Sequence, residues 1–137
     1  MANYYCAART NYFKVKDMNK FLAWAKQYEV KVIDDAHKES NPSEVRVGLI
    51  SENPDSGGWP SYDMDTDSDI DFVSLLSEHL ADDEVAIFVE AGSEKMRYVV
   101  GAAIAVNSAG DVLGVNIDDI YGLVKCEWGV KPTLAEY

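Results

Sequence analysis

The chain has 137 residues, and its 24 acids against 12 bases give a formal net charge of −12 at neutral pH. This length predicts a single domain, residues 1–137, with a hydrophobic core of its own. The acidity argues against direct binding to nucleic acids or to anionic membranes, because their phosphates would repel the chain. The longest apolar stretch, Val99 to Val106, is too short to cross a bilayer. No signal peptide is recognisable, so we expect a cytoplasmic protein.

The first fifty residues predict a strand, a helix and two further strands. Residues 4–15 are rich in aromatic and β-forming types and predict a strand that breaks near Thr10 and Asn11. Asp17 is then a candidate cap for a helix whose apolar face is carried by Met18, Phe21, Leu22 and Ala25. Two short strands follow, at 30–33 and 45–50, with a polar loop between them.

The middle of the chain predicts a long acidic loop over residues 51–69, followed by a helix. Two glycines and two prolines exclude regular structure from the first part of this loop. The helix is expected from about Ile70 to Leu80, because Phe72, Val73, Leu76 and Leu80 recur at helical spacing.

The last third predicts a three-stranded meander and a final helix. The strands are expected at 85–90, 96–107 and 112–116. The helix should run from about Asp119 to Trp128, with Asp118 as cap, Gly129 as stop, and Ile120, Tyr121 and Val124 facing inward. The order β-α-β-β-α-β-β-β-α predicts an antiparallel sheet with about three helices packed on it, which is the α+β class.

Two cysteines, Cys6 and Cys126, are too few for a disulfide framework. We expect them to be buried free thiols in a reducing compartment.

The net charge comes from one part of the sequence. Residues 51–94 contain 13 acids and no Lys or Arg, whereas the parts before and after have net charges of +2 and −1. Repulsion between the like charges of such a block destabilises the folded state. Ordinary protein surfaces avoid this by interspersing charges of both signs. Two interpretations stay open: a solvated loop that keeps the protein soluble, or a surface shaped for a basic partner.

Within this block, aspartate occupies every second position from Asp63 to Asp71. One interpretation is a calcium loop, although Ser68 and Ser74 stand where the EF-hand needs glycine and glutamate. Another is that the acids complement the dipole of the helix that follows. The third is phosphate mimicry, because alternate residues of an extended chain share a face at a step of about 6.6 Å. Only the third interpretation uses the whole block.

Catalysis has little support in the sequence. His37 and His79 belong to no catalytic motif, and no spacing of His and Cys fits zinc. There is no phosphate-binding glycine loop or nucleophile elbow. We therefore expect neither enzymatic activity nor a cofactor. Trp59, between Gly58 and Pro60, is either a plug over the core or an exposed anchor for a partner. A small enzyme or ligand binder with a cleft near Trp59 remains an alternative.

The acidic block, chiefly Asp63 to Asp71 and Asp82 to Glu84, resembles the small acidic anti-defence proteins of phages and plasmids. These include anti-restriction and anti-CRISPR inhibitors, several of which imitate DNA. The resemblance implies that the target is a nucleic-acid-binding effector in a bacterial cytoplasm. From the acidic block we expect a non-enzymatic inhibitor that presents an acidic, nucleic-acid-mimicking surface to such a basic effector; a calcium-binding module that uses Asp63 to Asp71 is the alternative. The predicted partner-binding residues are Glu52, Asp55, Trp59, Asp63, Asp65, Asp67, Asp69, Asp71, Glu78, Asp82, Asp83 and Glu84.

Overall fold

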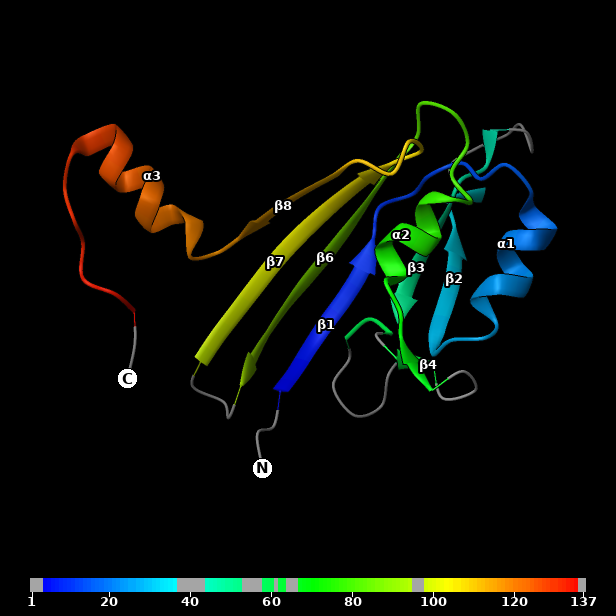
Figure 1. Cartoon of the computed structure of the whole chain (residues 1–137), viewed down its shortest axis with the longest axis horizontal. Coiled ribbons are helices and arrows are strands. Elements are labelled where there is room, and N and C mark those ends of the chain that lie inside the picture. Colours follow the sequence, from blue (N-terminus) through cyan, green and yellow to red (C-terminus); the bar gives the residue numbers. More distant parts are fainter. Residues whose placement is uncertain are drawn as a thin grey trace.

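The computed structural model describes residues 4–36, 44–52, 58–60, 62–63, 67–94 and 98–135 (Figure 1). The strands are β1 (Tyr4–Thr10), β2 (Val30–Asp34), β3 (Val47–Ser51), β4 (Tyr62–Asp63), β5 (Ser68–Asp69), β6 (Val85–Glu94), β7 (Tyr98–Asn107) and β8 (Val112–Asn116). The helices are α1 (Met18–Ala25), α2 (Phe72–Ser77) and α3 (Asp119–Trp128).

Six of the strands form one antiparallel sheet in the order β2-β3-β1-β6-β7-β8, so the predicted α+β class is confirmed. The predicted C-terminal meander is the β6-β7-β8 half of this sheet. The first strand, β1, lies in the middle, where it pairs with β6 along its whole length. The loop expected over 51–69 contains a small ribbon, because β4 and β5 pair antiparallel.

The register of the strands shows which residues share each face of the sheet. Phe88 and Ile104 are paired neighbours on one face, and Val89 and Ala103 are paired neighbours on the other. Both α1 and α2 cover the first face, where the hydrophobic core forms around Phe13, Phe21, Leu49, Leu76, Leu80 and Phe88. The result is a helical layer on one side of the sheet.

The break predicted near Thr10 is confirmed, and the structure gives its cause. The buried Thr10 hydroxyl accepts a hydrogen bond from the Leu49 amide at 2.8 Å and donates to the Asn11 carbonyl at 2.8 Å. A side chain thus replaces a strand-to-strand hydrogen bond at this point. The chain makes further bridges at Phe13 and Val15 before Asp17 caps α1 by accepting from the Lys20 amide at 3.1 Å.

The C-terminal elements lie apart from this core. We call the segment Val112–Ala135, which contains β8 and α3, the arm. All five residues of β8 are exposed, and α3 has no buried residue. Figure 1 shows the arm extending away from the body of the molecule. Ile120, Tyr121 and Val124 were expected to face inward, and this prediction is wrong for Ile120, which is 54% exposed. Tyr121 and Val124 are half-exposed.

The expected ends of α3 are found, but one cap works differently. Gly129 ends the helix with a left-handed φ of 66° and donates its amide to the Lys125 carbonyl at 3.0 Å. Asp118 makes no side-chain cap hydrogen bond. Instead, Asp119 accepts from the Asn116 amide at 2.8 Å, which ties the helix start to the end of β8.

The two cysteines are on different elements. Cys6 is half-buried in β1, whereas Cys126 is an exposed free thiol on α3, so the expectation that both are buried is wrong for Cys126. Among the described residues, no helix is long and apolar enough to span a membrane.

Candidate interaction surfaces

The acidic block spreads over the helix-covered side of the sheet. Asp67 and Asp69 precede α2, and Glu78, Asp82 and Asp83 follow it, so that Figure 1 places the two groups at opposite ends of this helix. The exposed acids of the block are Glu52, Asp67, Asp69, Asp71, Glu78, Asp82 and Asp83. Asp55 and Asp65 lie outside the described residues, as does the side chain of Asp63.

The alternating aspartates do not form the extended row expected of a strand. Asp63 pairs with Ser68, so the chain reverses direction between β4 and β5. Asp67 lies at this reversal with a left-handed φ of 52°, a conformation that Asp tolerates better than most residues. Asp63 and Asp69 therefore lie on two antiparallel strands and not along one extended strand.

Asp71 has a structural role as the N-cap of α2. One carboxylate oxygen accepts from the Ser74 amide at 3.2 Å, and the other accepts from the Ser74 hydroxyl at 2.8 Å. These hydrogen bonds lower the pKa of the Asp71 carboxyl. The sequence assigned Asp71 to the acids that complement the helix dipole, and the structure makes its contribution a direct cap.

Glu84 is also used by the fold. Its carboxylate accepts from the Lys14 amide at 2.7 Å and lies 3.9 Å from the Arg46 guanidinium. Glu84 thereby joins the turn before β6 to the segment that follows β1. It is half-buried, so it is less accessible to a partner than Asp82 and Asp83 beside it.

Trp59 is the plug over the core rather than an exposed anchor. Its ring stacks on Phe72 at 5.9 Å between centroids and meets Phe88 edge-on at 5.2 Å. Phe72 in turn stacks on Trp24, so an aromatic row joins the loop residue to α1 and α2. The indole nitrogen of Trp59 is buried and makes no hydrogen bond among the described residues.

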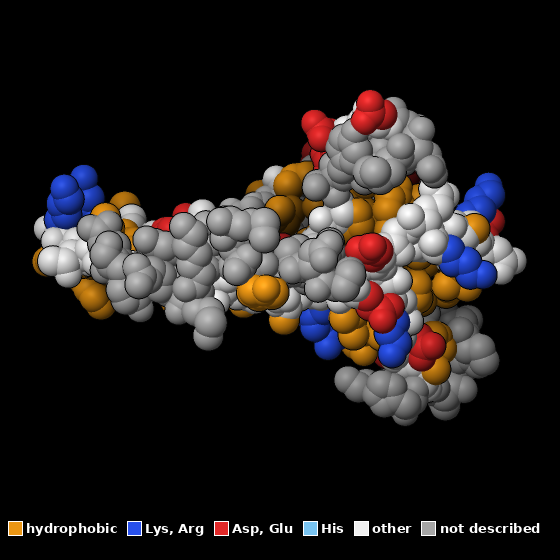
Figure 2. Space-filling model, turned by 90° about the horizontal axis from the view of Figure 1, so that it is seen from below, with side chains coloured by type: hydrophobic (Ala, Val, Ile, Leu, Met, Phe, Trp, Pro, Cys, Tyr) orange, Lys and Arg blue, Asp and Glu red, His pale blue; other side chains and the backbone are white. Residues whose placement is uncertain are grey.

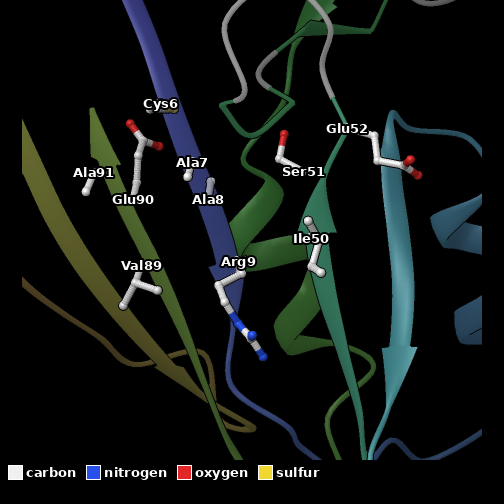
Figure 3. A pocket seen from close by; sticks show the side chains of 10 residues that line it. All are labelled: Cys6, Ala7, Ala8, Arg9, Ile50, Ser51, Glu52, Val89, Glu90 and Ala91. Atoms are coloured by element: carbon white, nitrogen blue, oxygen red, sulfur yellow. The ribbon is translucent and has the colours of Figure 1, made fainter. Parts of the chain in front are cut away.

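A hollow lies between β1 and β3 (Figure 3). The two strands pair at Arg9 and Ile50 and diverge from there toward Cys6 on β1 and Ser51 on β3. It has a volume of about 650 Å³ and is lined by Cys6, Ala7, Ala8, Arg9, Ile50, Ser51, Glu52, Val89, Glu90 and Ala91. Trp59 is not among these residues, so this hollow is not the cleft that the small-enzyme alternative requires.

Among the described residues, the groups considered for chemistry do not come together. His79 packs against the rings of Phe21 and Trp24, and burial is the main cause that lowers its pKa. His37 lies outside the described residues. Within the described ranges, no group of three or more His, Cys, Asp or Glu side chains is arranged to hold a metal ion.

The arm is an exposed surface that the sequence reasoning missed. Its helix was placed correctly but was assumed to pack inward on its own sheet. The composition of β8, Val-Leu-Gly-Val-Asn, contained a usable signal, because an edge strand without charge or proline is poorly protected against pairing with another chain. No family model, curated protein or solved structure matches this chain.

Proposed function

We propose that this protein is a non-enzymatic inhibitor that binds a basic, nucleic-acid-binding effector through the acidic block of residues 51–94. The observation that carries the proposal is the absence of Lys and Arg from these 44 residues, together with the exposure of the acids placed on both sides of α2. A surface of this sign competes with nucleic acid for cationic grooves, because both ligands release the same counterions.

The mode of binding that we propose is an acidic patch and not a copy of a phosphate backbone. Asp67 and Asp69 act at one end of α2, and Asp82 and Asp83 act at the other. Asp71 and Glu84 support the fold around them through hydrogen bonds. Complementary charge of this kind governs the rate of encounter and the choice of partner, and both effects weaken as salt rises.

The test begins with capture of partners from a bacterial lysate at increasing salt, followed by titration of the retained effector. We expect a retained protein that binds duplex DNA or RNA, and we expect nucleic acid and this protein to displace one another. Neutralising either pair, Asp67→Asn/Asp69→Asn or Asp82→Asn/Asp83→Asn, should weaken binding by on the order of 1–3 kcal/mol. Asparagine tolerates the left-handed backbone at Asp67 and Asp83.

The matched control removes the same charge outside the block. Glu29→Gln/Asp118→Asn neutralises two exposed acids of the flanking parts and should leave affinity within about 0.5 kcal/mol of the wild type. The proposal fails if no basic protein is retained at low salt, or if the effector binds nucleic acid and this protein at the same time. It also fails if the control pair weakens binding as much as the pairs within the block.

A further inference from the structure

Strand β8 forms an edge of the large sheet and lacks the devices that protect such edges. It pairs with β7 on one side, and no strand of the described part of the chain pairs with its other side. Its sequence contains no charge and no proline, and Leu113 and Val115 are 77% and 62% exposed. Natural edge strands are normally short, charged or covered, because a free row of amides and carbonyls pairs readily with another strand.

Helix α3 presents an apolar stripe that contacts no core. Ile120, Leu123, Val124 and Trp128 lie on one side of the helix at intervals of three and four residues. Trp128 is 75% exposed, and Leu123 is 57% exposed. A helix of ten residues is marginal in water without tertiary packing of its apolar side. The stripe therefore requires a surface to pack on.

An apolar surface on which the stripe of α3 could pack lies on the sheet face opposite α1 and α2. We call this the open face. It is formed by Val85, Ile87, Val89 and Ala91 of β6, by Ala103 and Ala105 of β7, and by Leu113 and Val115 of β8. The small alanine side chains of β7 leave room on this face, and the larger apolar side chains of α3 could pack there. Figure 2 shows hydrophobic side chains beside Lys or Arg side chains at the outer end of the molecule, which carries α3.

The accessible area indicates how large the missing contact is. The chain exposes 9450 Å². A compact monomer of this mass exposes about 7100 Å², so the excess is about 2300 Å². Obligate dimers bury from about 1000 to 2500 Å² on each subunit. The excess is therefore comparable to the area that each subunit of an obligate dimer buries.

The distribution of charge favours a second copy of this chain as the occupant. The arm has three acids and two bases, although the whole chain has a net charge of −12. Contact through the arm thus joins two nearly neutral surfaces and leaves the acidic blocks outside the interface, where they repel least. The arm's three acids and two bases leave a basic partner only one unit of net complementary charge, whereas the apolar edge of β8 can pair antiparallel with its own copy.

We propose that two copies of this chain form a symmetric dimer through their arms, with the unpaired edge of β8 and the apolar stripe of α3 buried against the second copy. This interface is separate from the acidic block and goes beyond the proposed function. The same residues meet on both sides of a two-fold axis, as in most homodimers.

The test measures the mass of the full chain by light scattering and analytical ultracentrifugation at micromolar concentrations. We expect about twice the chain mass of 15.2 kDa. Leu123→Lys and Val115→Lys should each shift the protein to the monomer. Both side chains are exposed in the single chain, so neither substitution removes a contact of the monomer core. Hydrogen exchange should show protection, in the wild type, of those β8 amides that point away from β7, and the loss of this protection in Val115→Lys.

The matched control is Met18→Lys, which places the same charge on an exposed apolar residue of α1, away from the arm. It should leave the dimer intact. A monomeric wild type would overturn the proposal. A monomer in which β8 and α3 are protected from exchange would show that the arm folds back on its own sheet. A dimer that survives both arm substitutions would also overturn it. Binding of the effector by a monomeric variant would separate this result from the proposed function.

Discussion

At the scale of single residues, the acids of the aspartate run have different roles. Asp71 makes two hydrogen bonds to Ser74, whereas the exposed Asp69 lies two positions earlier, in β5. We expect Asp71→Ala to lower the free energy of unfolding by about 1 kcal/mol, the usual cost of losing an N-cap. Asp69→Asn should leave it within about 0.5 kcal/mol of the wild type. Denaturant unfolding of both variants measures the difference, and an equal loss in both would instead support a general effect of the helix dipole.

His79 is the residue from which we expect a pH-dependent stability. Burial beside Phe21 and Trp24 is the largest cause that lowers the pKa of His79; Lys16 adds to it, and Glu78 opposes it. The folded state thus prefers the neutral imidazole. Its contribution to stability is complete above the unfolded pKa of about 6.5 and is lost as the pH falls through the lower folded value.

Thermal unfolding of the wild type and of His79→Gln at pH values between about 7.5 and 5.5 tests this dependence, in a window where most carboxylates stay ionised. The wild type should lose stability toward the acidic end, and His79→Gln should lose less. His37 is present in both proteins, so the comparison isolates the effect of His79. Equal slopes for the two proteins would show that His79 does not titrate differently on folding.

At the scale of elements, the pairing of β1 with β6 depends on a glycine. A Cβ added at Gly92 would lie 2.6 Å from the Cα of Cys6 and would also meet the carbonyl oxygen of Tyr5. Both are backbone atoms of the central strand, so Gly92→Ala must displace a strand. We expect a loss of about 1–3 kcal/mol, which is the usual cost of overpacking.

Gly122 provides the matched control for the same exchange. A Cβ built there meets no atom within 4 Å apart from its chain neighbours and the backbone of α3 itself, and its position is on the side of α3 opposite Ile120. Gly122→Ala should therefore stabilise the helix by up to about 1 kcal/mol. Calorimetry on both variants decides the matter: a stable Gly92→Ala protein would mean that β1 and β6 can move apart without cost.

The sequence predicted most elements but not their arrangement. Caps, apolar periodicity and glycine stops are local signals, and they located α1, α3 and the meander. The insertion of β1 between β3 and β6 depends on contacts between residues about 80 positions apart, which no local pattern encodes. The inward orientation assigned to α3 was wrong because an apolar stripe does not specify whether its own sheet or another chain covers it.

The candidate site was predicted only in part. The acidic block could be seen from composition, and its described side chains are mostly exposed. The sequence could not show whether the five alternating aspartates form one extended row. Such an alternation is compatible with a single strand and also with two strands joined by a reversal at Asp67. Trp59 was ambiguous for a similar reason, because its burial depends on Phe72 and Phe88 from other elements.

At the scale of the whole molecule, the body and the arm differ in how they are stabilised. The buried apolar residues that the structure describes run from Ala8 to Val106, and the arm contributes none of them. The acids placed around α2 belong to the body. The molecule thus separates a charged part, which suits a basic partner, from an apolar and nearly neutral part, which suits a second copy.

This separation has a consequence for how the protein comes to be assembled during its synthesis. Because the buried apolar residues that the structure describes end at Val106, the part of the chain before the arm can fold while the arm is still in the ribosomal tunnel. In the dimer that we propose, pairing of the arms would then be a later, bimolecular event whose rate rises with the local concentration of chains. Neighbouring ribosomes on one messenger would bring such chains together, so assembly would proceed fastest where translation is most dense.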